Sequence, residues 1–207
     1  MNFVAHLFLS PCNDAFRVGS ILADFTVGKM DQIEESFGPD ISVGIRHHRE
    51  VDRFTDSHDA VCACVNAMKD SFGIYGAIVS DVMFDHFLLR HWKRYCTISK
   101  ETFFASVYQS LTLMRPEFPR HYQVTVRRML ERRWLHTYED VENTAYALQR
   151  IGERFTRKTP LSDALPGLKQ HYDVLENTFL LFFPQLQRFS DELISEIFEG
   201  RARADAR

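Results

Sequence analysis

Residues 77–92 place apolar side chains on every face of a helical wheel. A helix without a polar face has to be buried on nearly all sides, so the chain must supply other helices to surround it. Turn-forming residues are scarce, with 9 Gly and 7 Pro in 207 residues, which is low for a protein built from many short strands. We therefore predict an all-α fold, a single-domain helical bundle over residues 1–207.

Hydrophobic periodicity divides the chain into helical segments with no recognisable linker or internal repeat. We predict helices over residues 2–10, 14–27, 39–56, 59–72, 74–95, 99–115, 120–135 and 138–155. Two long helices are predicted after Pro160, with Pro184 as the candidate break between them. A chain of this length buries roughly 70% of its unfolded surface on folding, so a bound metal ion would serve chemistry rather than hold the fold together.

Composition and missing motifs exclude several classes of function. A formal net charge of −3, from 25 Lys and Arg against 28 Asp and Glu, argues against a nucleic-acid binder. We expect no membrane span, because the most apolar stretch, residues 74–92, is interrupted by charged residues. The four cysteines form no C-x-x-C pair and follow no secretory leader, which indicates reduced thiols and a cytoplasmic protein. No Gly-rich phosphate loop, G-x-S-x-G or H-E-x-x-H motif is present.

Three polar residues interrupt the apolar segment 77–92, namely Asp81, Asp85 and His86. Asp81 and Asp85 are four residues apart and share one helix face, where two like charges repel unless something neutralises them. An unpaired buried carboxylate costs several kcal/mol. Either a cation lies between the two acids, or each is paired structurally, with Arg90 as the nearest basic partner.

A second polar group follows the predicted helix over residues 39–56. His48, Asp52 and Asp56 stand at successive i, i+4 positions, which is ligand spacing for a divalent ion. Imidazole and carboxylate ligands together favour Mn²⁺, Fe²⁺ or Mg²⁺ over a thiolate-bound zinc. The same stripe is also compatible with a solvated helix face. His6 and Asp24 interrupt two further apolar segments, and a bundle can direct such residues from several helices to one interior point, as in a metal-dependent phosphohydrolase.

Five ordered motifs resemble the acyl carrier protein phosphodiesterase family, also called acyl carrier protein hydrolyase. They read Asn2-Phe-x-Ala-His-Leu-x-Leu9, Gly19-x-x-Leu-Ala-Asp-Phe-x-x-Gly28, Gly44-Ile-x-x-His-Arg-x-x-Asp-x-x-Thr-Asp56, Asp81-Val-Met-x-Asp-His-Phe-Leu-x-Arg-His-Trp92 and His171-Tyr-Asp-x-Leu-Glu-x-x-Phe-x-x-Phe-x-Pro184. The resemblance spans most of the chain and is less distinctive over residues 93–130. It departs from the family pattern at Arg46, where the family has a histidine, and the metal-binding His-Asp doublet of HD enzymes is reversed here as Asp85-His86.

The resemblance implies an all-α, HD-type phosphohydrolase-like enzyme. Such an enzyme hydrolyses the phosphodiester that links 4′-phosphopantetheine to the serine of holo-acyl carrier protein, with Mn²⁺ as the favoured activator. We predict direct metal ligands at His48, Asp52, Asp85 and His86, with Asp24 and Asp81 bridging or orienting. Phosphate binding is predicted for Arg49 or Arg90, and proton donation to the serine oxygen for His6.

The implied partner is acyl carrier protein, which is small and acidic. A basic segment suited to it contains Arg127, Arg128, Arg132 and Arg133, although an ordinary solvated helix has the same pattern. Two other functions remain open at this stage. One is a metal-dependent phosphohydrolase of nucleotides or another small phosphodiester, and the other is a non-catalytic module that binds the carrier protein.

Overall fold

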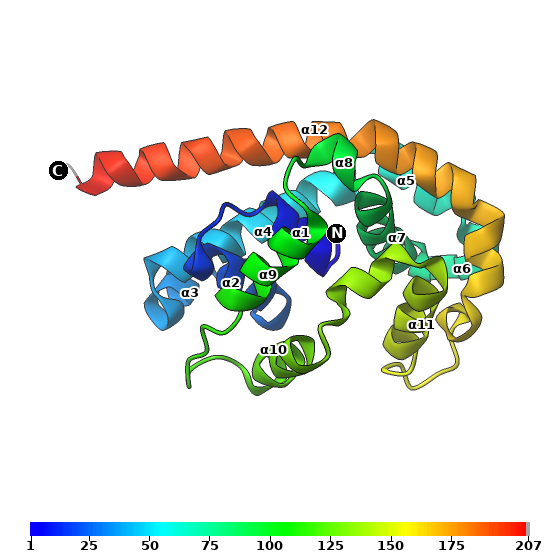
Figure 1. Cartoon of the computed structure of the whole chain (residues 1–207), viewed down its shortest axis with the longest axis horizontal. Helices are drawn as coiled ribbons and strands as arrows, with labels where there is room; N and C mark the ends of the chain where they lie inside the picture. Colours follow the sequence, from blue (N-terminus) through cyan, green and yellow to red (C-terminus); the bar gives the residue numbers. More distant parts are fainter. Residues whose placement is uncertain (206–207) are drawn as a thin grey trace. The chain divides into compact units, whose positions relative to one another are not determined.

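The computed structural model describes the backbone of residues 1–205 and the side chains of residues 1–200 (Figure 1). Within these residues the secondary structure is entirely helical, which confirms the all-α prediction. The elements are α1 (Phe3–Leu9), α2 (Asp14–Leu22), η1 (Ala23–Phe25), α3 (Met30–Phe37), α4 (Pro39–Ser57), α5 (Asp59–Ala67), α6 (Lys69–Phe72), η2 (Gly73–Tyr75), α7 (Gly76–Arg90), α8 (Trp92–Tyr95), α9 (Lys100–Ser110), α10 (Arg120–Arg132), η3 (Trp134–Glu139), α11 (Val141–Gly152), η4 (Pro160–Asp163) and α12 (Leu165–Asp205).

Two differences from the predicted helices have a physical explanation. Helix α3 was not predicted, because its eight residues are mostly polar and only Ile33 is buried. Helix α12 continues through Pro184, where we expected a break. A proline inside a helix removes one backbone hydrogen bond and strains the preceding turn. Burial of Phe179, Phe183 and Leu186 on either side offsets this cost.

The described chain divides into two compact units, and each is assembled from three separate segments. Unit 1 contains Met1–Ala5, Phe54–Lys100 and Trp134–Pro184, and unit 2 contains His6–Arg53, Glu101–Arg133 and Gln185–Arg207. The segments alternate along the sequence, so neither unit can be obtained by a single cut of the chain.

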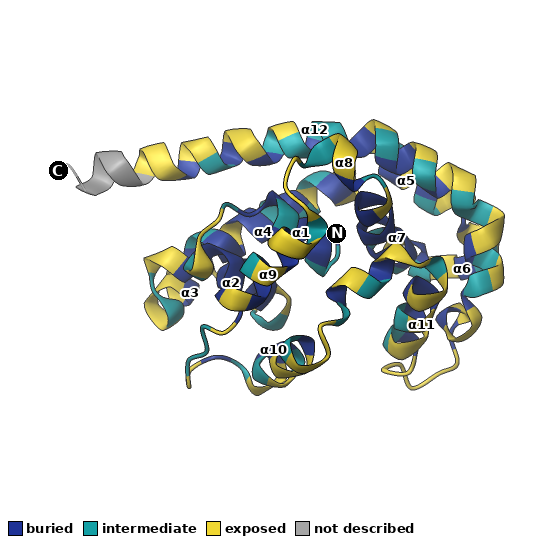
Figure 2. Cartoon of the chain, in the orientation of Figure 1, coloured by how far each residue is buried: buried dark blue, intermediate teal, exposed yellow. Residues whose placement is uncertain are grey.

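The core of unit 1 is built around α7. Eleven of the fifteen residues of α7 are buried, and Figure 2 shows this helix almost wholly in the buried colour. Phe84 and Phe87 contact aromatic rings of α12, including Phe179 and Phe182, at centroid distances of 5.7–5.9 Å. The prediction that this helix is buried on nearly all sides is thereby confirmed.

The stretch Lys69–Arg90 bears on the membrane prediction. Within the described residues it is the segment whose length and mean hydropathy of 1.3 would suffice to cross a membrane. In the structure 67% of its apolar window is buried inside the protein, and the stretch is divided among α6, η2 and α7. A core helix of a globular protein meets the same length and composition criteria, so this finding is weak evidence for a membrane span.

In unit 2 the backbones of α2 and α4 touch where two glycines face the opposite helix. A Cβ added to Gly19 would lie 2.1 Å from the carbonyl oxygen of Ile41, and one added to Gly44 would lie 2.1 Å from that of Phe16. No side chain fits at either position, so the two helices approach as closely as backbones allow.

This contact yields a prediction about stability. Gly44→Ala should lower the free energy of unfolding by at least about 3 kcal/mol, because the added methyl group collides with backbone that cannot move aside cheaply. Gly200→Ala is the matched control, since a Cβ at Gly200 in α12 would meet nothing within 4 Å, and alanine favours a helix over glycine. Urea unfolding measured by circular dichroism tests both variants, and equal stability of the two would contradict the packing argument.

Candidate metal centre

Four polar residues of unit 2, namely His6, Asp24, His48 and Asp52, form one cluster of ion pairs. His6 lies in α1 and is fully buried, while His48 and Asp52 lie one turn apart in α4. Asp24 lies in η1, the short helix that continues α2. The α2–α4 backbone contact explains the meeting, because Asp24 follows Gly19 by five residues and His48 follows Gly44 by four.

The Asp52 carboxylate uses one oxygen for each histidine. Its Oδ1 lies 3.0 Å from His6 Nε2, and its Oδ2 lies 3.0 Å from His48 Nε2. Asp24 Oδ1 approaches the same nitrogen of His48 to 3.3 Å. The two imidazole rings stack with centroids 3.6 Å apart and an interplanar angle of 12°. Ligand atoms of His6, His48 and Asp52 therefore all lie within 4.8 Å of one another.

The histidine rings are buried, whereas the carboxylates reach solvent. The side chains of His6 and His48 are 1% and 4% exposed, and those of Asp52 and Asp24 are 36% and 43% exposed. A small ion or a water molecule can thus enter the cluster from the side of the two acids. The buried rings restrict the position of anything that binds there.

Burial and mutual contact separate the charge states of the two histidines. Burial, reinforced by the neighbouring His48, lowers the pKa of His6 to about 4. Burial would also lower the pKa of His48, but hydrogen bonds to Asp24 and Asp52 outweigh it and raise the pKa to about 9. Burial would raise the pKa of Asp52, but hydrogen bonds from His48 and His6 hold it well below its usual range. At pH 7 without a bound ion, His48 is therefore protonated and His6 is neutral.

The donor atoms of this cluster fit a divalent cation. The Nε2 atoms of His6 and His48 both face the Asp52 carboxylate, and the Nδ1 atoms of the two rings are buried without a hydrogen-bond partner. One nitrogen of each ring and one carboxylate oxygen lie within 4.8 Å of one another, a spacing from which a single cation can be bound. Imidazole and carboxylate ligands together suit Mn²⁺, Fe²⁺ or Mg²⁺.

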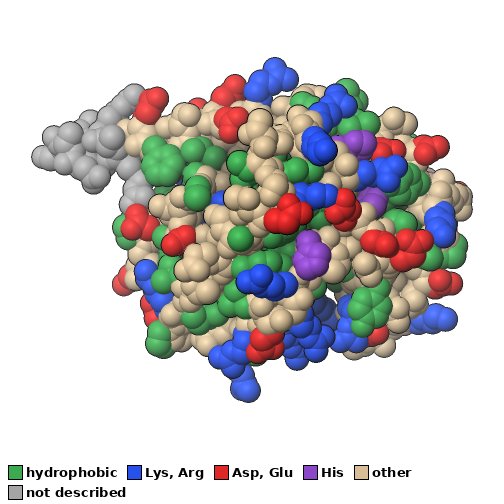
Figure 3. All heavy atoms as spheres, in the orientation of Figure 1, with side chains coloured by type: hydrophobic (Ala, Val, Ile, Leu, Met, Phe, Trp, Pro, Cys, Tyr) green, Lys and Arg blue, Asp and Glu red, His purple; other side chains and the backbone are tan. Residues whose placement is uncertain are grey.

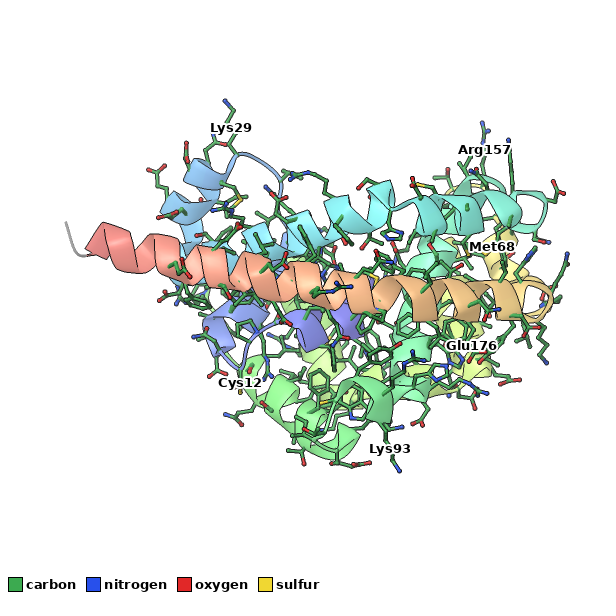
Figure 4. The ribbon with its side chains drawn as sticks, turned by 90° about the horizontal axis from the view of Figure 1, so that it is seen from above. Cys12, Lys29, Met68, Lys93, Arg157 and Glu176 are labelled. Carbon is green, nitrogen blue, oxygen red and sulfur yellow. The ribbon has the colours of Figure 1, made fainter. Side chains whose placement is uncertain are left out.

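Arg49, predicted to bind phosphate, has a different role in the structure. Its Nη1 donates to the carbonyl of Gly28 at 2.9 Å, and its Nη2 donates to the carbonyl of Thr26 at 2.9 Å. Gly28 has a φ of +114°, a backbone conformation that other residues rarely adopt. The loop ends at Lys29, whose side chain points away from the protein (Figure 4). Arg49 thus holds the loop that follows Asp24, and its contact with phosphate stays a prediction.

Asp85 and Asp81, predicted as metal ligands, have separate partners in unit 1. Asp85 is fully buried and accepts hydrogen bonds from the backbone N–H groups of Val4 at 2.9 Å and Ala5 at 2.8 Å. It therefore caps the first turn of α1, whose N–H groups have no partner inside the helix. Asp81 lies 3.0 Å from the ammonium group of Met1. The structure thus gives both acids structural partners, the alternative left open by the sequence.

His86 and Arg90 also have partners of their own in unit 1. The Nδ1 atom of His86 lies 2.9 Å from the carbonyl oxygen of Tyr138, and its Nε2 atom lies 2.7 Å from the hydroxyl of Tyr172. Arg90 Nε lies 3.3 Å from Glu176 of α12, which Figure 4 labels. With both ring nitrogens of His86 hydrogen-bonded, the predicted ligand role of this residue has no support in the geometry.

Sequence reasoning assigned no role to Tyr172 and Glu176, although both belong to the motif at residues 171–184. The motif was the signal that could have identified both residues. In the structure Glu176 also lies 2.7 Å from His91 Nε2. Asp56, the third member of the predicted ligand stripe, is exposed. The ligand atoms that lie within 4.8 Å of one another belong to His6, His48 and Asp52.

The predicted docking residues lie on and directly after α10 in unit 2. Arg127, Arg128, Arg132 and Arg133 are all exposed, and basic side chains are visible along the edge of the molecule where α10 lies (Figure 3). Arg133 ends the helix in the left-handed conformation, with a φ of +47°. Its guanidinium lies 5.3 Å from the ring centroid of Tyr108.

Comparisons with known proteins agree with the motifs. A family model described as acyl carrier protein phosphodiesterase matches residues 1–186. The acyl carrier protein phosphodiesterase of Yersinia pestis is 31% identical over 191 residues, which cover 91% of this chain and 96% of the relative. Its namesake from Escherichia coli O6:K15:H31 is 32% identical over 187 residues, covering 90% of this chain and 95% of the relative. No solved structure matches the chain.

The capping role of Asp85 leads to a prediction. Asp85→Ala should lower the free energy of unfolding by about 3 kcal/mol at pH 7, because two buried N–H groups lose their acceptor. Asp85→Asn keeps an acceptor oxygen and should cost less. Burial raises the pKa of Asp85 to about 7, so the contribution of Asp85 to the free energy of unfolding should fall as the pH rises from 4 to 7, because the folded protein retains a proton there that the unfolded chain releases.

Urea unfolding between pH 4 and 8 measures this slope, which Asp85→Asn should remove. If Asp85 serves only as a cap, Asp85→Asn should also leave the affinity of the protein for Mn²⁺ unchanged. If Asp85→Asn keeps its fold but no longer binds Mn²⁺, Asp85 would have to be assigned as a metal ligand after all.

Proposed function

The chain belongs to the acyl carrier protein phosphodiesterase family, and on this premise we propose that it hydrolyses the phosphodiester between 4′-phosphopantetheine and the serine of holo-acyl carrier protein. Water adds to phosphorus, the bond from phosphorus to the serine oxygen breaks, and that oxygen takes up a proton. The products are apo-acyl carrier protein and 4′-phosphopantetheine. The observation that supports this proposal is the cluster of His6, His48, Asp52 and Asp24. We expect the enzyme to act in the cytoplasm.

We further propose that the cluster holds a divalent cation, with Mn²⁺ as the first candidate and Mg²⁺ or Fe²⁺ as alternatives. His6, His48 and Asp52 would hold the ion, with Asp24 beside them. Such an ion lowers the pKa of a bound water molecule and neutralises phosphate oxygens. The charge of the cluster supports the proposal of a cation. Two carboxylates and one imidazolium leave the cluster with a net negative charge, which would repel an anionic phosphodiester.

The residues themselves have distinct tasks in this proposal. Asp52 contacts both histidines and holds their Nε2 atoms beside its carboxylate. Asp24 lines the open side, where a phosphodiester can approach. His6, which we expected to donate a proton to the serine oxygen, is a poor donor near pH 7 because burial lowers its pKa to about 4. Its neutral imidazole is suited to a ligand role instead.

A mass measurement tests the proposed reaction directly. Incubation of holo-acyl carrier protein with the enzyme and Mn²⁺ should remove the mass of 4′-phosphopantetheine from the carrier. Asp52→Asn should reduce the rate at least about 100-fold, because one histidine loses its acceptor oxygen and the cluster loses a negatively charged ligand. His121→Gln is a matched control at an exposed histidine and should leave the rate unchanged.

Two outcomes would overturn the proposal. Hydrolysis of free nucleotides with no change in the carrier would identify a small-molecule phosphohydrolase. Binding of the carrier without any loss of mass, at saturating Mn²⁺, would identify a non-catalytic module.

We also propose that the exposed arginines of α10 dock the acidic carrier protein. Reversing charge at Arg128 and Arg132 should raise KM for the carrier about tenfold and flatten the decrease of kcat/KM with salt, since steering between opposite charges would be lost. Reversing charge together at Arg157 and Arg188, two exposed positions outside α10, controls for the same change in net charge. Steady-state rates between 20 and 500 mM NaCl provide the measurement, and an unchanged salt profile would place docking elsewhere.

A further inference from the structure

The hydroxyl of Ser190 joins three helices of unit 2 at a fully buried point. Ser190 lies in α12 and has no exposed surface. Its Oγ lies 2.8 Å from His47 Nε2 in α4 and donates to the carbonyl of Leu9 in α1 at 3.3 Å. The neighbouring Leu186 and Leu193 of the same helix are buried and apolar. A hydroxyl among them is tolerated only because it is hydrogen-bonded.

The direction of these hydrogen bonds follows from counting protons. The Ser190 hydroxyl has one proton, which it gives to Leu9, so His47 must donate its Nε2 proton to the serine oxygen. The remaining nitrogen of His47, Nδ1, is buried without a hydrogen-bond partner. In a neutral ring this nitrogen carries a lone pair, which is less costly to leave unpaired than an N–H group. The chain His47 to Ser190 to Leu9 is therefore directional.

Both ends of this chain adjoin residues of the proposed metal centre. His47 immediately precedes His48 in α4, and Leu9 lies three residues after His6 in α1. The carbonyl of His6 is held as well, by the hydroxyl of Ser10 at 2.8 Å and that of Ser20 at 3.5 Å. A single hydroxyl thus limits how far the two histidine-bearing helices can move relative to each other.

We infer that Ser190 is a positioning residue that sets the separation of His6 and His48 and thereby the affinity of the centre for a divalent cation. This inference rests on the proposed function, in that it assumes a cation at the cluster. Residues outside the direct ligands commonly change metal affinity 10–100-fold when they are replaced. Ser190 lies beyond residues 1–186 matched by the family model, so the match does not extend to this contact.

Mn²⁺ affinity of the purified full-length protein, measured by electron paramagnetic resonance titration, tests this inference without the carrier protein. Ser190→Ala should raise the Kd for Mn²⁺ about tenfold. Ser195→Ala is the matched control, because Ser195 lies on the same helix, is exposed and bonds only to the Asp191 carbonyl of its own helix. Its Kd should equal that of the wild type. Thermal unfolding in EDTA shows whether either variant is destabilised in the absence of metal.

Replacements at His47 show whether the effect passes through the proposed pair. His47→Gln retains an N–H donor and should retain most of the Mn²⁺ affinity, whereas His47→Leu should lose it to the same extent as Ser190→Ala. Adding Ser190→Ala to His47→Leu should cause no further loss. Full additivity of the two changes would overturn the inference.

The remaining outcomes separate this inference from the function it rests on. If the wild type binds Mn²⁺ and hydrolyses the carrier while Ser190→Ala has unchanged affinity, the positioning role is overturned and the function stands. Lower stability in EDTA with unchanged Kd would show a purely structural contact and overturn it equally. If the wild type binds no Mn²⁺, the metal proposal falls together with this inference.

Discussion

The close contact between α2 and α4 is the constraint on which the candidate site depends. Gly19 and Gly44 let the two helix backbones meet without intervening side chains. Asp24 and His48 lie about one turn further along their respective chains, so the same contact places a carboxylate beside an imidazole. Any side chain at either glycine would separate the helices, and the Asp24 to His48 approach of 3.3 Å would be lost first.

Polar residues inside apolar helices serve two different purposes in this protein. In unit 2 the buried His6 and His48 direct their Nε2 atoms at the Asp52 carboxylate, which reaches solvent. In unit 1 the fully buried Asp85 has its oxygens occupied by backbone N–H groups at the start of α1. A ligand at Asp85 would have to displace buried hydrogen bonds, which is costly. The cluster of unit 2 is therefore the better candidate for binding chemistry.

Electrostatics connects the site with its proposed substrate. The cluster alone carries excess negative charge, yet its proposed substrate is an anionic diester on an acidic protein. A divalent cation held by neutral histidines would cancel the charge of the two carboxylates, and the exposed arginines of α10 would attract the carrier from a distance. The protein can thus keep a net charge of −3 overall and still attract an acidic partner.

The spacing of residues in the sequence was sufficient to predict the features that depend on a single helix. The burial of α7 followed from its apolar faces, and His48 and Asp52 were predictable as neighbours because residues four apart share a helix face. His6 and Asp24 were predicted to join this group, but the contacts of His6 with Asp52 and of Asp24 with His48 were decided by tertiary packing. Packing within unit 1 also gave Asp85 and His86 hydrogen-bond partners of their own. Helical periodicity determines which side chains share a helix face. Contacts between helix backbones, such as that of Gly19 with Ile41, determine which residues of other helices that face meets.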